Sequence, residues 1–127
     1  MKLLLDTNIL IWAAADSENL PAFARKALSD PKSELYVSTA SAWEIAIKVN
    51  LGKLVFPVDR LATILDETGC IVLPIGLDHA IAAAALPKHH ADPFDRMLIA
   101  QAQLENLTLV TVDSIIPRYG VATHPLH

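Results

Sequence analysis

Short, uninterrupted apolar runs separated by helix-forming segments constrain the fold of this chain more than any other feature of its sequence. Continuously apolar strands are buried on both faces, whereas alternating strands leave one face in water. Strands separated by helices pair in parallel through right-handed crossovers. The pattern predicts an α/β fold, a three-layer domain with a central parallel sheet flanked by helices. The expected strands are Leu3–Leu5, Leu35–Val37, Ile71–Leu73 and Leu107–Val112, with Val121–Thr123 as a candidate short fifth strand.

The segments between these runs carry recognisable helix boundaries. Ser38 or Thr39 can cap the helix after the second strand, and Gly52 follows its end. Asp92 and Pro93 supply an N-cap and a first-turn proline for the last helix. The expected helices are Ile9–Ala15, Pro21–Leu28, Ala40–Leu51, Asp59–Thr68, Leu77–Leu86 and Phe94–Glu105.

Composition indicates one globular domain, which we expect to span residues 1–127. Hydrophobic residues make up 53% of the chain and charged residues 19%, a balance that permits a packed core and excludes intrinsic disorder. The longest apolar runs, Ile9–Ala15 and Ala80–Leu86, are shorter than the roughly 18–20 residues of a membrane-spanning helix. Asp6 interrupts the N-terminal apolar run before a secretory signal can form, and the single cysteine, Cys70, fits a reducing compartment. We therefore expect a cytoplasmic protein with no membrane segment.

The net charge of −4 and a pI near 5.6 argue against a protein that coats nucleic acid through a broad basic patch. This balance still permits an enzyme that meets nucleic acid through metal ions. We expect His89 and His90 to be solvated in a surface loop, and Trp12 and Trp43 to lie in the core. The basic side chains that could hold a phosphate backbone are Lys48, Lys53, Lys88 and Arg96, although solvation at the surface is the default for these residue types.

Four acidic residues from distant parts of the chain are expected at one edge of the sheet. Asp6 follows the first strand and Asp113 follows the fourth, and ligand sites of parallel sheets form outside the carboxyl ends of the strands. Glu44 and Asp95 each share a helix face with apolar residues, so both side chains are expected to point inward.

Clustered carboxylates require protons or cations, because two unit charges 4 Å apart repel by about 4 kcal/mol at an effective dielectric constant of about 20. A ligand set made of oxygen, without cysteine or paired histidines at zinc spacing, favours Mg²⁺ or Mn²⁺ over zinc. Such a site activates water and bridges phosphate oxygens, which is the chemistry of phosphodiester hydrolysis. The candidate catalytic and metal-binding residues are Asp6, Glu44, Asp95 and Asp113.

Each acid also has a purely structural explanation. Asp6 could cap the helix that follows it, and Glu44 could pair with the lysine one turn later. Asp92 is better explained as an N-cap than as a ligand, and Asp95 resembles the acid of a capping box. Asp113 suits an Asx turn. The catalytic hypothesis therefore depends on the joint placement of the four acids.

Four sequence motifs contain these acids and stand in order over essentially the whole chain. They are Leu4-Leu5-Asp6-Thr7-Asn8, Ser41-Ala42-Trp43-Glu44-Ile45-Ala46-Ile47-Lys48, His90-Ala91-Asp92-Pro93-Phe94-Asp95-Arg96 and Leu109-Val110-Thr111-Val112-Asp113. The motifs resemble those of the PIN-domain family, and within it the VapC-type toxins of bacterial and archaeal toxin–antitoxin modules. The resemblance implies a PIN fold whose acidic cluster holds Mg²⁺ or Mn²⁺, with the family's acids falling on Asp6, Glu44, Asp95 and Asp113.

The resemblance also implies a function: a metal-dependent endoribonuclease that acts as a toxin on RNA, forms a homodimer and is inhibited by a cognate VapB-like antitoxin. Asp92 is an extra acid typical of one subgroup and remains assigned as a helix cap. Asn8 stands where relatives in that subgroup often carry histidine.

Two other functions remain open at this point. The first is a PIN-fold binding module that has lost its chemistry. The second, a receiver-like phosphoacceptor domain, is disfavoured because the run Ile71–Ile75 offers no aspartate and Asp6 has no acidic neighbour.

Overall fold

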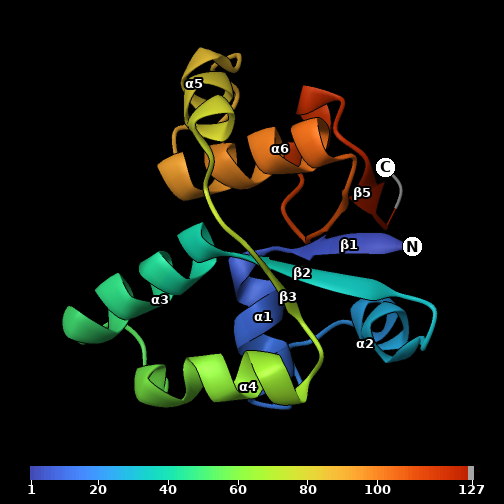
Figure 1. The fold of residues 1–127 in the computed structure, drawn as a ribbon, viewed down its shortest axis with the longest axis vertical. Coiled ribbons are helices and arrows are strands. Elements are labelled where there is room, and N and C mark those ends of the chain that lie inside the picture. Colours follow the sequence, from blue (N-terminus) through green and yellow to red (C-terminus); the bar gives the residue numbers. More distant parts are fainter. Residues whose placement is uncertain (126–127) are drawn as a thin grey trace.

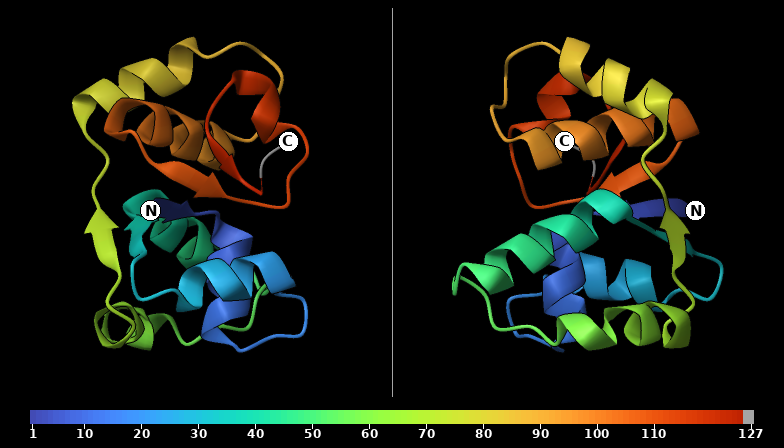
Figure 2. Two further views of the ribbon diagram at one scale, coloured as in Figure 1. Left: turned by 90° about the vertical axis from the view of Figure 1, so that its right-hand side faces the viewer. Right: turned by 60° about the vertical axis from the view of Figure 1, so that its left-hand side comes forward.

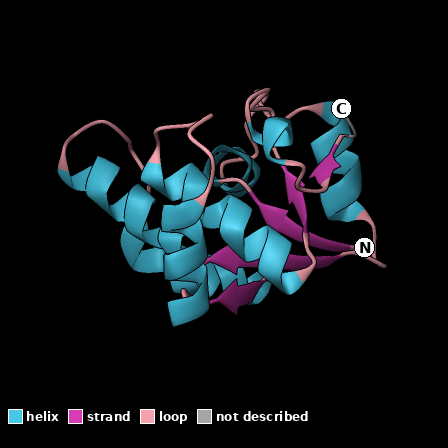
Figure 3. Cartoon of the chain, turned by 90° about the horizontal axis from the view of Figure 1, so that it is seen from above, coloured by secondary structure: helices cyan, strands magenta, loops and turns pink. Residues whose placement is uncertain are grey.

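A computed structural model describes residues 1–125 and shows a five-stranded sheet in which every strand pair is parallel (Figure 1). The strand order is β3-β2-β1-β4-β5, which places β1 at the centre. The strands fan out in Figure 3, as the twist of a parallel sheet requires. Residues 126 and 127, the last two of the predicted domain 1–127, lie outside the described part of the chain. The strands are β1 (Lys2–Leu5), β2 (Glu34–Ser38), β3 (Ile71–Leu73), β4 (Thr108–Val110) and β5 (Thr123–His124).

Helices cover both faces of this sheet and make three layers, as the two views of Figure 2 show. The predicted three-layer α/β fold is therefore confirmed. Within residues 1–125, none of the helices is long and apolar enough to cross a membrane. One layer holds α1 (Thr7–Ala14), α2 (Ala22–Ser29), α3 (Thr39–Asn50), the 3₁₀ helix η1 (Val58–Arg60) and α4 (Leu61–Glu67), and the other holds α5 (Leu77–Ala85), α6 (Pro93–Glu105) and the 3₁₀ helix η2 (Ile116–Tyr119).

The three leucines of β1 explain why the sheet has a core on each side. Leu3 and Leu5 pack into the cluster formed with α1 to α4, whereas Leu4 packs into the cluster beneath α6. All three are at most 2% exposed, and burying one leucine side chain stabilises a fold by roughly 1.5–3 kcal/mol. The uninterrupted apolar run is thus the sequence signature of a strand with two buried faces.

Capping side chains set the direction of the two helices that matter for the site. Ser38 Oγ accepts a hydrogen bond of 3.0 Å from Ala40 N at the start of α3, and Asp92 Oδ1 accepts one of 2.8 Å from Phe94 N at the start of α6. Both predicted caps are confirmed, and Gly52 follows α3 with φ of +72°, a conformation that costs glycine little.

Most element ends differ from the sequence-based prediction by one or two residues, and three elements differ in a way that the hydrogen bonds describe. The strand expected at 107–112 is the shorter β4, and a turn follows it in which Thr111 Oγ1 accepts a 3.0 Å bond from Asp113 N. The fifth strand lies at Thr123–His124 rather than at 121–123. The helix expected at 59–68 is divided into η1 and α4, because Arg60 N bonds Pro57 O in a 3₁₀ turn.

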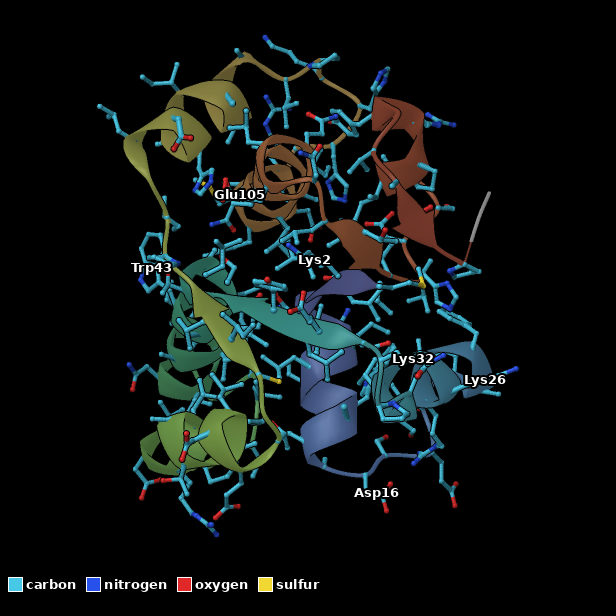
Figure 4. The ribbon with its side chains drawn as sticks, turned by 45° about the vertical axis from the view of Figure 1, so that its right-hand side comes forward. Lys2, Asp16, Lys26, Lys32, Trp43 and Glu105 are labelled. Atoms are coloured by element: carbon cyan, nitrogen blue, oxygen red, sulfur yellow. The ribbon has the colours of Figure 1, made fainter. Side chains whose placement is uncertain are left out.

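Trp43 is the clearest error in the predicted core. It is 62% exposed and projects from α3 at the edge of the molecule (Figure 4), with its ring edge-on to that of Phe94 at 5.4 Å. Trp12 is partly buried against the core, as expected. Trp43 and the inward-pointing Glu44 are neighbours in the sequence, so they emerge about 100° apart around the helix.

Candidate active site

The carboxyl edge of the sheet gathers all four predicted acids around one pocket of about 260 Å³. In Figure 1 the N-terminal ends of α3 and α6 approach the end of β1 at this edge. The joint placement on which the catalytic hypothesis depends is therefore observed. The pocket is lined by Asp6, Thr7, Asn8, Glu44, Lys48, Asp92, Asp95, Val112 and Asp113.

Asp6 is held at the end of β1 by a threonine that sequence reasoning missed. Thr111 Oγ1 donates a 2.6 Å hydrogen bond to Asp6 Oδ2 and accepts one from the backbone N–H of Asp113. Burial raises the pKa of Asp6, and the Thr111 hydroxyl offsets part of this rise. Asp6 occupies the N-cap position of α1, as its structural explanation predicted, but among the described residues its side chain makes no capping hydrogen bond to this helix.

The two carboxylate oxygens of Glu44 differ in their hydrogen bonding. Lys48 Nζ donates to Glu44 Oε2 at 2.8 Å, which confirms the predicted pairing and raises the pKa of Lys48. Glu44 Oε1 is buried and has no hydrogen-bond partner among residues 1–125. Leaving a buried polar atom unpaired costs about 1–3 kcal/mol, more for a charged group, so this oxygen indicates a ligand position.

A buried 2.9 Å bond from Thr7 Oγ1 to Ser41 Oγ joins α1 to α3 beneath the pocket.

Asp95 and Asp113 both approach one ring nitrogen of His90, Nε2. His90 Nε2 lies 2.8 Å from Asp113 Oδ2 and 3.0 Å from Asp95 Oδ2. Burial, together with the nearby charges of Asp6 and Asp92, raises the pKa of Asp95 from its usual 3.8 to about 7. Burial lowers the pKa of His90, but its bond to Asp113 and the surrounding carboxylates outweigh this effect and raise the pKa overall.

The structural explanations that the sequence offered for Asp113 and Asp95 have different outcomes. Asp113 Oδ1 accepts a 2.8 Å bond from Ile115 N, so the predicted Asx turn is confirmed and coexists with a place in the site. The capping-box explanation of Asp95 is wrong, because the backbone N–H of Asp92 donates to His90 Nδ1 instead. Asp92 itself caps α6, as predicted.

The two adjacent histidines behave differently, and the prediction was correct for only one of them. His89 is exposed, with its ring edge-on to that of Tyr119 at 5.0 Å. The His90 side chain is only 15% exposed, so the expectation that it is solvated is wrong. The signal available in the sequence was its place in the His90–Arg96 motif, directly before the Asp92 cap.

Arg96 binds the backbone rather than facing the pocket. Its guanidinium donates to the carbonyl oxygens of Ala83, Leu86 and Pro87 at 3.0, 2.9 and 2.9 Å. These bonds join the end of α5 to the start of α6. Of the basic residues that could hold phosphate, Lys48 is the one that lines the pocket.

The donor set fits a hard divalent cation. The candidate ligands are carboxylate oxygens, which Mg²⁺ and similar ions prefer, and one of them, Glu44 Oε1, is buried and unpaired among the described residues. Ligand atoms of His90, Asp95 and Asp113 also lie within 4.8 Å of one another. Cation binding would neutralise a cluster that otherwise holds its charge only at an energetic cost.

The acidic pocket at the carboxyl edge of a parallel sheet agrees with the resemblance drawn from the motifs. The chain matches the PIN domain family over residues 3–122 and belongs to that family. Among curated relatives, Ribonuclease VapC16 of Mycobacterium tuberculosis is 38% identical over 71 residues, which cover 55% of this chain and 48% of that protein. The match thus spans about half the length of that relative.

Solved structures share the fold over nearly the whole chain. VapBC2 from Rickettsia felis, bound to a DNA fragment from its promoter, superposes with a TM-score of 0.72 at 17% identity and covers 98% of both chains. DNA-bound VapBC from Salmonella typhimurium gives a TM-score of 0.72 at 22% identity, covering 98% of this chain and 97% of that one. The predicted PIN fold is therefore confirmed.

Proposed function

We propose that this chain is a metal-dependent endoribonuclease, the toxin of a VapBC-like toxin–antitoxin module, built on a single PIN domain. The observation that carries this proposal is the convergence of Asp6, Glu44, Asp95 and Asp113 on one pocket in which a buried Glu44 oxygen has no partner among the described residues. The similarity to a protein named as a ribonuclease supports the reaction class.

The pocket supports a proposed role for each acid. Asp6 and Asp95 would be the principal ligands of Mg²⁺ or Mn²⁺, and Glu44 and Asp113 would complete the site directly or through water. A cation held there would supply positive charge to the scissile phosphate and would lower the pKa of an attacking water. Asp95, whose pKa is raised to about 7, would have to give up its proton to bind the cation.

Two neighbouring side chains support this arrangement. The Thr111 hydroxyl fixes one oxygen of Asp6, whose side chain lines the pocket. Lys48 fixes one oxygen of Glu44 and brings a positive charge to the wall of the pocket, where an RNA phosphate would approach.

The proposed partners are an RNA substrate, a VapB-like antitoxin and a second copy of the chain. Support for the antitoxin comes from the similar structures, which are VapBC complexes. The lone cysteine, Cys70, supports action in a reducing cytoplasm. The homodimer is carried over from the VapC resemblance and is tested by measuring the mass of the purified chain in solution.

Cleavage of total cellular RNA by the purified chain tests the proposal, with Mg²⁺, Mn²⁺ or EDTA present. Asp6→Asn is the test variant, because it removes one charge without changing shape. Asp66→Asn, at an exposed site on α4, is the matched control. We expect discrete fragments that require metal, persist in the control and vanish in Asp6→Asn. Metal-dependent cleavage at an unchanged rate in folded Asp6→Asn would contradict the assignment. A folded wild-type chain that binds metal and cleaves no RNA would favour the inactive binding module.

A further inference from the structure

The loop between α5 and α6 holds His90 by its backbone as well as its ring. The backbone N–H of His90 donates a 2.6 Å bond to Tyr119 Oη, and its carbonyl oxygen accepts one of 3.3 Å from Arg96 Nη1. The backbone N–H of Asp92 donates to His90 Nδ1 at 3.2 Å. These contacts come from η2, from α6 and from the cap of α6, so the position of the ring is set by three separate anchors.

The anchors determine which ring nitrogen carries the proton in the neutral imidazole. Nδ1 accepts a hydrogen bond, so the proton resides on Nε2. Nε2 in turn faces Asp113 Oδ2 at 2.8 Å and Asp95 Oδ2 at 3.0 Å. The Nε2–H donates to Asp113, which follows β4, and pairs electrostatically with Asp95 in the first turn of α6.

We propose that His90 is a positioning residue that sets the separation and orientation of the Asp95 and Asp113 carboxylates for the divalent cation. This inference rests on the proposed function, since it concerns the metal site of that nuclease. The Nε2–H donates a hydrogen bond to Asp113 Oδ2, and the same nitrogen lies 3.0 Å from one oxygen of Asp95, so the ring ties the two carboxylates together while Asp95 still lines the pocket. Hydrogen-bonding partners of ligating carboxylates fix ligand geometry, and their loss typically weakens metal binding by about 10–100-fold.

The observed contacts favour this role over two others. A ring that blocks the site and swings away would have to give up its bonds at Nδ1 and Nε2, while its backbone stays anchored to Tyr119 and Arg96. A ring that ligates the cation would need a free lone pair on Nε2, the nitrogen that carries the proton. Both of these roles are distinct outcomes of the experiment below.

The test is calorimetric titration of the full chain with Mn²⁺, comparing wild type, His90→Ala, His90→Gln and the matched control His89→Ala. We expect His90→Ala to bind Mn²⁺ about 10-fold more weakly or worse, and His89→Ala to bind like wild type. His90→Gln should recover part of the affinity, because its amide keeps an N–H donor. Mn²⁺ affinity that is unchanged in His90→Ala would overturn the proposal. Tighter binding would also overturn it, since the ring would then be a competitor of the cation.

Pulsed electron paramagnetic resonance of the Mn²⁺-loaded wild-type chain separates positioning from ligation. We expect no directly coordinated nitrogen, and a direct nitrogen coupling that disappears in His90→Ala would make His90 a ligand and overturn the proposal. If His90→Ala does not fold, Tyr119→Phe tests the same point, because it keeps His90 but removes the oxygen that binds its backbone N–H. Its Mn²⁺ affinity should fall in the same direction by a smaller factor, and an unchanged affinity would refute the anchoring.

The result also separates this inference from the proposed function. Wild-type protein that binds no Mn²⁺ would remove the metal site and both proposals with it. Wild-type protein that binds Mn²⁺ and cleaves RNA, with His90→Ala unchanged in affinity, would remove only the role of His90.

Discussion

Replacing Asp95 by asparagine should stabilise the chain at neutral and alkaline pH when divalent cations are absent. Burial, with the charges of Asp6 and Asp92, raises the pKa of Asp95 to about 7. The ionised carboxylate is therefore held at a cost in the folded protein. Asparagine keeps the shape of the side chain and an oxygen close to His90 Nε2, while it removes the charge.

The sign and size of the effect follow from proton linkage. The folded chain binds the Asp95 proton more tightly than the unfolded chain, where the pKa is near 3.8. The stabilisation of the fold by this tighter proton binding is complete below about pH 4 and is lost as the pH rises through about 7. A difference of about three pKa units corresponds to about 4 kcal/mol. Screening by solvent and salt at a side chain that is 17% exposed lowers the expected cost to about 2–4 kcal/mol.

Urea unfolding in EDTA at about pH 5 and about pH 8 measures this cost in wild type, Asp95→Asn and the exposed control Asp66→Asn. We expect Asp95→Asn to have a higher free energy of unfolding than wild type at about pH 8. The difference between the variant and wild type should be about 2 kcal/mol larger at about pH 8 than at about pH 5. The control should stay within about 0.5 kcal/mol of wild type at both. Excess Mg²⁺ should stabilise wild type and leave Asp95→Asn nearly unchanged. A gain independent of pH, or a loss of stability at about pH 8, would refute the reasoning.

Two further predictions concern the side chains that hold the site in place. Thr111→Val removes the hydroxyl that donates to Asp6 Oδ2, and we expect urea unfolding to show a free energy of unfolding about 1–3 kcal/mol lower than in wild type. A free energy of unfolding equal to that of wild type would mean that this bond does not stabilise the fold. Asp92→Ala removes the N-cap of α6 and should lower the free energy of unfolding by about 1 kcal/mol in the same assay. Asp92→Ser keeps a capping oxygen, so its free energy of unfolding should lie close to that of wild type. Equal losses of stability in the two variants would argue against the cap.

Local sequence signals were sufficient for the layers of the fold and for the acids of the site. The leucines of β1 predicted a strand buried on both faces because that burial excludes polar side chains from either face. Ser38 and Asp92 predicted their helix starts because a cap acts within three residues along the chain. Asp6 and Asp113 were found because each directly follows the position of a strand, and parallel strands end at the same edge.

The predictions that failed concerned residues whose surroundings are set by contacts with residues far away in the sequence. Trp43 was expected in the core and lies exposed beside Phe94 of α6, because the packing of α3 on α6 fixes which face of α3 is covered. His90 was expected in water and lies against two carboxylates, because Tyr119 and Arg96 fix the loop that carries it. Thr111 was unremarked because its partner, Asp6, lies at the other end of the sequence.

The sequence by itself determined the parallel sheet, its two helix layers and the identity of the four acids, since apolar runs, caps and strand ends act over short distances along the chain. The tertiary structure alone decided how those acids are held. It brought the Thr111 hydroxyl to Asp6, left one Glu44 oxygen without a partner among the described residues, and placed the Nε2 atom of His90 against both Asp113 and Asp95. The physical reason is that hydrogen-bond geometry and desolvation depend on distances between segments, which only the packed layers establish.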